Sequence, residues 1–179
     1  MIRRPPRSTQ GVSSAASDVY KRQIITNNNR AGVIEKSKKL NVPFLILNKD
    51  QFNSESALIK IEKFNPSLII LAGFLLKISK NIIEKFPNKI INIHPSLLPA
   101  YGGKGMYGMH IHKKVIQNKE NESGLTIHYV NEEYDKGQIV FQKKVKVNLE
   151  DSPELLAKKI LNQEHLYYPK IIEEILKNE

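Results

Sequence analysis

The chain has 179 residues, a length typical of one domain, and 40% of them are hydrophobic, which is enough to bury a core. The absence of cysteine excludes disulfides, a thiol nucleophile and cysteine-bound zinc. The 28 Lys and Arg residues outnumber the 18 Asp and Glu residues, but they are scattered and accompany no reader motif, so we expect no nucleic-acid partner. The longest apolar run, residues 68–76, is too short to cross a membrane.

The first 23 residues differ from the rest of the chain. They are rich in Arg, Pro and Ser and lack apolar periodicity, which is typical of a loop or a disordered segment. One interpretation is an organellar transit peptide, because the segment is nearly free of acidic residues. We favour a second interpretation, a translated adapter joined to the protein inside a strand. The sequence therefore predicts a non-native or disordered leader over 1–23 and one domain over 24–179.

From residue 24 onward, strands of the buried type alternate with helices. Apolar runs predict strands over residues 24–26, 43–47, 68–72 and 90–93. Helical spacing and a capping serine predict helices over residues 31–40, 54–63 and 78–86. This alternation is typical of an α/β fold with a mostly parallel sheet and helices on both faces. Ligands of such sheets bind beyond the carboxyl ends of the strands, here at residues 73–78 and after Ile93.

The second half of the chain begins with a long loop rich in Pro and Gly between residues 95 and 108, and long ordered loops are usually functional. A helix is expected over residues 107–118, then strands over 125–130 and 138–147. The final helix begins at Ser152, with proline at its first position. We expect this helix to end near His165, and to be broken or restarted at Pro169.

Two segments carry the chemistry. Asn92 and His94 are two residues apart in a predicted strand, so their side chains point to the same face. An amide donor beside an imidazole suits stabilisation of an oxyanion together with proton transfer, although such a pair is often structural. The second segment, residues 124–137, is a strand and turn that reach Asp135. A carboxylate near His94 would favour the imidazolium form of that side chain, but the Asp-Lys-Gly sequence alone is also an ordinary turn.

Together the two segments resemble the folate-dependent formyltransferases. The motif NIHPSLLP, residues 92–99, is shared across that family, and residues 124–147 are similar to its signature around a catalytic aspartate. The stretch AYGGKGMYGMHIH, residues 100–112, resembles the branch that acts on glycinamide ribonucleotide. The resemblance covers residues 24–179 and implies a Rossmann-like, mostly parallel sheet of the formyltransferase type.

The resemblance implies that a formyl group passes from 10-formyltetrahydrofolate to the amine of glycinamide ribonucleotide, in cytoplasmic de novo purine biosynthesis. It makes His94 the general acid, Asn92 the donor to the oxyanion, and Asp135 the group that holds His94 charged and relays a proton through water. Glu164 resembles a residue that contacts the nucleotide substrate. The folate-binding residues that the resemblance implies are Leu75, Leu76, Lys77, Ile78, Asn92, Asn131, Glu132, Glu133, Tyr134 and Asp135.

The resemblance also sets the expected partners and leaves alternatives open. We expect small-molecule substrates, no metal, no nucleic acid, no membrane, and a monomer or weak homodimer. The family's first strand and its phosphate-binding loop at a helix N-terminus have no counterpart before residue 24, so we expect weak binding of the ribonucleotide. The open alternatives are a related formyltransferase, a formyltetrahydrofolate hydrolase, and an inactive folate-binding fragment. His128 could face the catalytic cleft or pack in the core.

Overall fold

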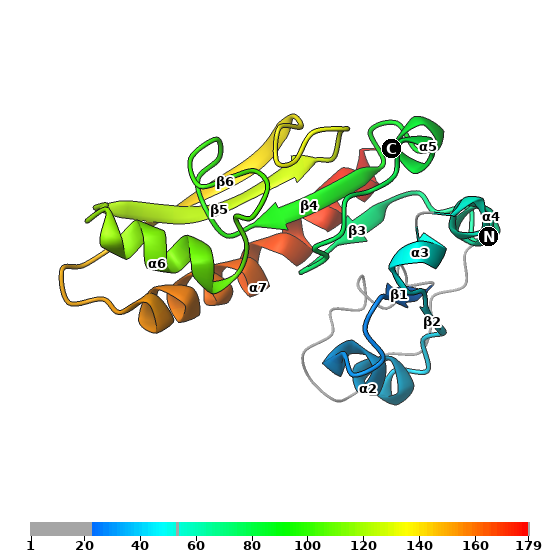
Figure 1. Ribbon diagram of the computed structural model, residues 1–179, viewed down its shortest axis with the longest axis horizontal. Coiled ribbons are helices and arrows are strands. Elements are labelled where there is room, and N and C mark those ends of the chain that lie inside the picture. The colour runs from blue at the N-terminus through cyan, green and yellow to red at the C-terminus, as the bar shows by residue number, and fades with distance from the viewer. Residues whose placement is uncertain (1–22, 53, 179) are drawn as a thin grey trace. The chain divides into compact units, whose positions relative to one another are not determined.

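The computed structural model describes residues 23–52 and 54–178, so the predicted leader lies outside the described residues except for Gln23 (Figure 1). The chain divides into two compact units, Met1–Pro66 and Ser67–Glu179. Within the described ranges, no helix combines the length and the apolar character that a membrane crossing requires.

The first unit contains a strand–helix–strand arrangement followed by two helices. Strand β1 (Ile24–Thr26) pairs in parallel with β2 (Phe44–Ile46), and α2 (Gly32–Lys39) connects them. Helices α3 (Lys49–Phe52) and α4 (Glu55–Glu62) follow. Four of these elements match the expected ones, but α3 was not expected, because a single turn gives no apolar periodicity. Ser54 occupies the predicted N-cap position of α4, but its hydroxyl does not cap the helix. It donates instead to the Gln51 carbonyl at 2.6 Å.

The second unit is built on a four-stranded sheet in the order β3–β4–β5–β6. The strands are β3 (Ile69–Leu71), β4 (Ile90–His94), β5 (Glu122–Tyr129) and β6 (Ile139–Lys146). Strands β3 and β4 are parallel and joined through α5 (Lys80–Lys85), whereas β5 and β6 run antiparallel to their neighbours. The α/β class is confirmed, but the described sheet is mixed, because the short β5–β6 connection permits only an antiparallel hairpin.

Helices α6 (Met109–Gln117) and α7 (Pro153–Lys177) gather on one face of this sheet (Figure 1). The core between them is made of aliphatic side chains and one tyrosine: Ile91, Ile111, Val115, Leu125, Ile127, Leu156, Ile160, Tyr168 and Ile171. On the other face, the loop after β4 packs against β5. The Leu98 N–H donates to Thr126 in β5, and Gly124 leaves room for the Leu97 side chain.

Helix α7 runs without a break from Pro153 to Lys177, so the predicted interruption at Pro169 is wrong. Its beginning is as expected, because the Ser152 hydroxyl accepts a hydrogen bond from the Leu155 N–H at 3.2 Å. An interior proline typically costs a helix about 3 kcal/mol. The neighbours Tyr168 and Ile171 are buried in the core, and their packing outweighs that cost because each buried apolar side chain contributes about 1.5–3 kcal/mol.

Candidate active site

The pairing of β4 with β5 brings four polar side chains to one face of the sheet. Asn92 lies opposite His128, and His94 lies opposite Thr126. Side chains alternate along a strand, so these four share the face that is not packed on α6 and α7. Three of the four are buried, and Asn92 is half-buried. The carboxyl end of β4 therefore carries a protected polar cluster.

Asp135 joins this cluster from the turn between β5 and β6. Its Oδ1 atom lies 3.6 Å from His94 Nδ1 and 3.7 Å from His128 Nε2. Its Oδ2 atom accepts a hydrogen bond of 2.8 Å from the Gly103 N–H, in the loop after β4. A Cβ at Gly102 would lie 2.5 Å from the end of the Leu98 side chain and 3.3 Å from Asp135 Cβ, so glycine eases the close approach of the loop to the carboxylate. The structure thus brings Asn92, His94 and Asp135 together.

His128 is the site residue whose place the sequence left open, and the structure puts it in the cluster. Its Nδ1 atom lies 2.8 Å from the Tyr129 carbonyl oxygen, which can only accept, so Nδ1 carries the proton. Burial lowers the pKa of His128, so its ring is neutral at pH 7. Its Nε2 atom therefore accepts from Asn92 Nδ2 at 3.2 Å. This contact orients the Asn92 amide and leaves its second N–H and its oxygen for a ligand.

A signal for His128 is present in the sequence. The residue alternates with Leu125 and Ile127 in a strand, which places it on the same face as Thr126. What pattern alone could not supply is the register that sets His128 opposite Asn92.

Thr126 holds the turn that follows His94. Its hydroxyl donates to the Ser96 carbonyl at 2.7 Å and accepts from the Leu98 N–H at 3.0 Å. The Gln142 side-chain amide donates to the same hydroxyl at 2.9 Å. Thr126 and Ser96 are fully buried. One hydroxyl thus satisfies backbone groups that water does not reach.

The segments expected to bind folate adjoin each other in the second unit. The Lys77 ammonium lies 6.0 Å from the centre of the Tyr134 ring, and Lys80 lies 3.6 Å from Glu132. Leu75 and Tyr134 expose much of their apolar surface, whereas Ile78 is buried. Exposed apolar side chains beside cations suit a flat aromatic ligand that carries carboxylates.

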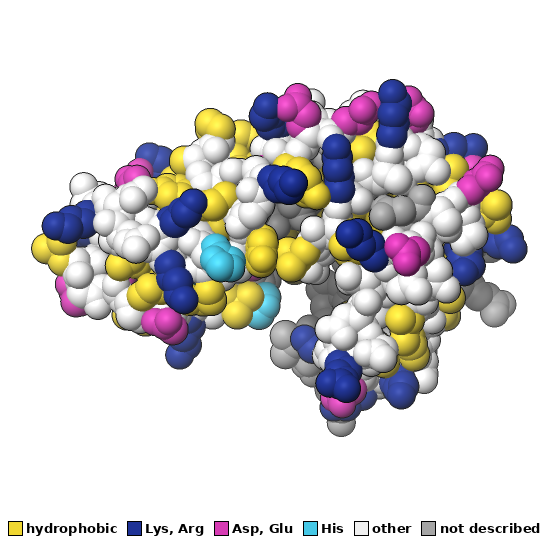
Figure 2. Space-filling view, viewed as in Figure 1, with side chains coloured by type: hydrophobic (Ala, Val, Ile, Leu, Met, Phe, Trp, Pro, Cys, Tyr) yellow, Lys and Arg dark blue, Asp and Glu magenta, His cyan; other side chains and the backbone are white. Residues whose placement is uncertain are grey.

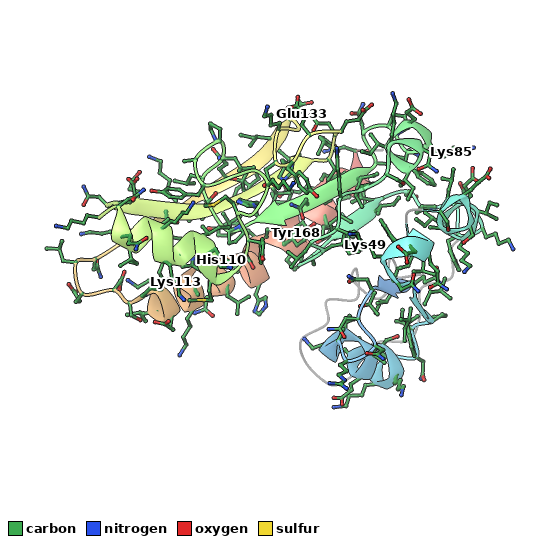
Figure 3. All side chains as sticks on the ribbon, in the orientation of Figure 1. Lys49, Lys85, His110, Lys113, Glu133 and Tyr168 are labelled. Atoms are coloured by element: carbon green, nitrogen blue, oxygen red, sulfur yellow. The ribbon has the colours of Figure 1, made fainter. Side chains whose placement is uncertain are left out.

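The rim of this segment pair is charged and solvent-exposed. Glu133 lies at the exposed edge of the β5–β6 turn (Figure 3), and its hydrogen bond from Lys136 lowers the pKa of its carboxyl. The remaining residues of the expected folate set are half-buried or exposed: Leu76, Asn131 and Glu132.

Glu164 is placed on a different element, helix α7. Burial raises the pKa of its carboxyl. One helical turn later, the Tyr168 hydroxyl donates to the Leu71 carbonyl at 2.8 Å, at the carboxyl end of β3 (Figure 3). This contact ties the helix that carries Glu164 to the strand that leads into the expected folate segment.

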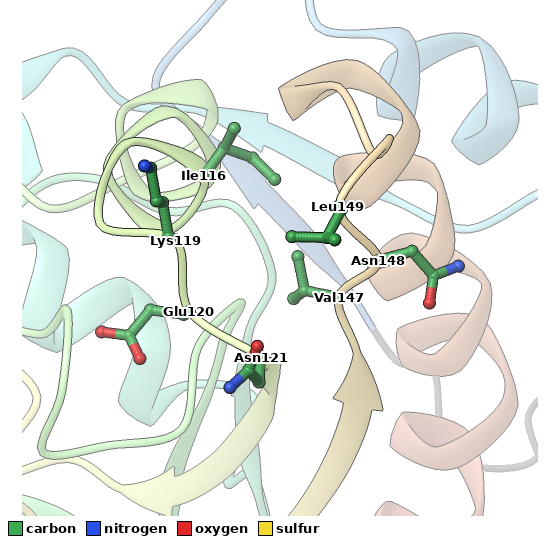
Figure 4. Close-up of a pocket in the computed structure, with 7 residues that line it drawn as sticks. All are labelled: Ile116, Lys119, Glu120, Asn121, Val147, Asn148 and Leu149. Carbon is green, nitrogen blue, oxygen red and sulfur yellow. The ribbon is translucent and has the colours of Figure 1, made fainter.

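Two cavities differ in their relation to the cluster. One of about 290 Å³ is lined by Leu98, Pro99, Asp135, Lys136, Gly137 and Ile139, so it opens onto the carboxylate. The other, of about 60 Å³, lies between the end of α6 and the loop after β6 (Figure 4) and touches none of the cluster. The larger one is the relevant space, because it reaches the chemically competent side chains.

The described residues also bear on metal ligation and on the distribution of surface charge. Among them, no group of three or more His, Asp or Glu side chains is arranged to hold a metal ion. His112 is buried and His110 exposed, so these two histidines do not face a common point. On the face shown in Figure 2, Lys and Arg side chains are spread among acidic and apolar ones.

An α/β sheet that gathers an amide, an imidazole and a carboxylate at the end of a strand has the features of a group-transfer enzyme. A family model described as formyl transferase matches residues 8–172. The chain belongs to the formyl transferase family.

Individual relatives agree with this assignment. Over 155 residues the chain is 39% identical to phosphoribosylglycinamide formyltransferase, chloroplastic, of Arabidopsis thaliana, covering 83% of this chain and 53% of that protein. It is 30% identical to the Escherichia coli phosphoribosylglycinamide formyltransferase, covering 84% of this chain and 71% of that protein. The crystal structure of the Anaplasma phagocytophilum phosphoribosylglycinamide formyltransferase superposes with a TM-score of 0.80 at 30% identity, covering 88% and 74% of the two chains. The chain thus spans about half the length of the plant relative.

Proposed function

We propose that this protein transfers the formyl group of 10-formyltetrahydrofolate to the amine of glycinamide ribonucleotide, a step of de novo purine biosynthesis. The observation that carries the proposal is the convergence of Asn92, His94 and Asp135, with His94 and Asp135 3.6 Å apart. The relatives named above support the choice of acceptor. A cytoplasmic location and a monomer or weak homodimer belong to the same proposal, and they rest on the family resemblance.

The three side chains divide the work of acyl transfer. As the substrate amine attacks the formyl carbon, negative charge develops on the formyl oxygen, and a His94 ring N–H donates to it. The Asn92 N–H that His128 leaves free donates to the same oxygen, and one such donor is typically worth about 3–4 kcal/mol of the barrier. Asp135 Oδ1, 3.6 Å from His94 Nδ1, stabilises positive charge on that ring as the reaction proceeds. Through water, it passes the proton of the attacking amine to the folate nitrogen that leaves.

Two further groups of residues hold the substrates. Leu75, Leu76, Lys77 and Ile78 form one wall of the folate slot, and residues 131–135 form the other. The contact between Lys77 and Tyr134 supports this arrangement, because it joins the two walls at their outer end. Glu164 accepts hydrogen bonds from the ribose hydroxyls of the ribonucleotide. The chemistry needs no metal, because protein donors stabilise the oxyanion.

The first experiment measures formyl transfer with glycinamide ribonucleotide and with water as the only acceptor. We expect transfer to the ribonucleotide and negligible folate turnover without it. Folate turnover in water alone would identify a hydrolase, and folate binding without any turnover would identify an inactive binding protein. Either result would refute the proposal.

Variants then test the catalytic residues. Asn92→Ala is expected to reduce kcat by about 10²–10³, the usual loss for one donor to an oxyanion. Asn121→Ala is the matched control, because this asparagine borders the cavity of Figure 4 and lies outside the cluster. Asp135→Asn should lower turnover strongly while the unfolding transition stays near that of the parent. Unchanged turnover would remove Asp135 from the mechanism.

A further inference from the structure

The two ring nitrogens of His94 have different surroundings. Nε2 lies 2.8 Å from the carbonyl oxygen of Tyr101, and a carbonyl only accepts, so Nε2 carries a hydrogen. Nδ1 faces Asp135 Oδ1 at 3.6 Å, which is beyond hydrogen-bonding distance. A backbone carbonyl therefore fixes which nitrogen of His94 points toward the carboxylate.

The backbone that supplies this carbonyl is held in an unfavourable conformation. Tyr101 has a φ of 56°, in the left-handed region that side-chain-bearing residues rarely adopt. Such conformations persist only where the surrounding structure imposes them, and they are common at functional sites. The buried Ser96 hydroxyl helps here, since it donates to the preceding carbonyl, that of Ala100, at 2.7 Å.

The other end of the same residue is anchored about twenty positions further along the chain. The Tyr101 hydroxyl donates to Glu120 at 2.7 Å and accepts from the Asn118 side-chain amide at 2.8 Å. Both partners lie just after α6, where Figure 4 shows Glu120 in the turn that leads to β5. The ring packs against the core of the second unit. Burial, and then the bond to Glu120, raise the pKa of the Tyr101 phenol, so its proton stays in place for that bond.

We propose that Tyr101 is a positioning residue for His94. The anchored side chain holds the Tyr101 carbonyl on the Nε2 hydrogen, so that Nδ1 is the nitrogen that, when protonated, donates to the formyl oxygen. Without the anchor, the carbonyl moves away and the imidazole turns over or changes tautomer, so fewer molecules have the reactive nitrogen in place. This inference rests on the proposed function for the reaction, but the tautomer itself is a property of the free protein.

Tyr101→Phe tests the anchor, because it keeps the ring and removes only the hydroxyl. Tyr107→Phe is the matched control in the same loop, since this exposed tyrosine packs edge-on against His110. Glu120→Gln keeps an oxygen acceptor and should behave like the parent. Should Tyr101→Phe fail to fold, Asn118→Ala removes the other anchor from the surface.

The first readout is the ¹⁵N NMR signature of the neutral His94 ring in the free protein, recorded at the high-pH end of its measured titration and identified by its loss in His94→Asn. We expect the Nε2–H tautomer in the parent, in Tyr107→Phe and in Glu120→Gln, and a mixture in Tyr101→Phe. The second readout is kcat, which we expect to fall roughly tenfold in Tyr101→Phe while both KM values change little. This loss is smaller than the 10²–10⁴-fold contribution typical of general acid–base catalysis, because His94 itself is still present.

A merely structural tyrosine would lower the unfolding temperature without changing the tautomer. An Nδ1–H tautomer in the parent, or a Tyr101→Phe protein with the parent's tautomer and kcat, would overturn the inference. Failure of the proposed function looks different, because formyl transfer would then be absent in the parent while the His94 signature remained readable.

Discussion

Thr126→Val removes a hydroxyl from the inside of the second unit and leaves the shape of the side chain almost unchanged. In the parent, that hydroxyl donates a hydrogen bond to the Ser96 carbonyl and accepts hydrogen bonds from the Leu98 N–H and the Gln142 amide. Leaving a buried polar group unpaired costs about 1–3 kcal/mol. The two backbone groups are buried, whereas the Gln142 amide keeps its bond to the Leu98 carbonyl. We therefore expect a loss of about 3 kcal/mol in the free energy of unfolding.

The same substitution should weaken catalysis. The bonds to Ser96 and Leu98 hold the turn that leaves β4 directly after His94, so their loss lets the imidazole move relative to Asp135. A displacement of about 1 Å at a catalytic group can cost about a hundredfold in rate. Urea unfolding gives the stability, and initial rates of formyl transfer to the ribonucleotide give kcat.

Thr126→Ser is the control, because it keeps the hydroxyl and deletes one buried methyl group, a change typically worth about 1 kcal/mol. The hydroxyl argument requires the valine variant to be clearly less stable than the serine variant. A valine variant within about 0.5 kcal/mol of the parent, or one no worse than the serine variant, would refute it.

Three other predictions concern separate parts of the chain. Because burial raises the pKa of Glu164, the KM for the ribonucleotide should rise as the pH falls toward that raised pKa. Glu164→Gln should abolish this pH dependence. The same pH profile of KM in the variant and the parent would show that Glu164 does not bind the substrate. Pro169→Ala should raise the free energy of unfolding by about 2 kcal/mol, because alanine restores a helix hydrogen bond. A lower free energy of unfolding in the variant would show that the proline ring is needed for packing. Burial lowers the pKa of His112 and His128, so the unfolded state binds more protons below pH ~6.5. Urea midpoints should be highest above that pH, fall as the pH drops from about 6.5 to the lower folded-state pKa values, and level off below them. A flat profile between pH 7.5 and 5 would contradict this.

The sequence predicts the elements better than it predicts how they combine. Alternating apolar runs and helical spacing locate the strands and helices, and the period of two places Asn92 and His94 on one face. The predicted break at Pro169 is wrong, because a rule based on proline alone does not account for the apolar side chains that this part of the helix buries. The short β5–β6 hairpin is local, whereas the antiparallel pairing of β5 with β4 joins segments far apart in the sequence, which a local pattern does not encode.

The candidate site shows the same division. Asp135 is expected from the family signature, but its contact with the loop after β4 depends on a glycine that permits close approach. The role of Tyr101 is not visible in any motif, because it acts through its backbone carbonyl and through partners beyond the next helix. Residues that work through the main chain leave no signature in the chemistry of their side chains.

The polar cluster is nonetheless a consequence of the apolar core. Ile91 in β4 and Leu125 and Ile127 in β5 are all fully buried against α6 and α7. Shifting β5 by one residue against β4 would turn its two apolar side chains to the other face, so the core forbids that register. Once the apolar residues are seated, alternation leaves Asn92 and His128 on the opposite face, and the observed register sets them opposite each other. Packing on one face of the sheet thus sets the geometry of the chemistry on the other.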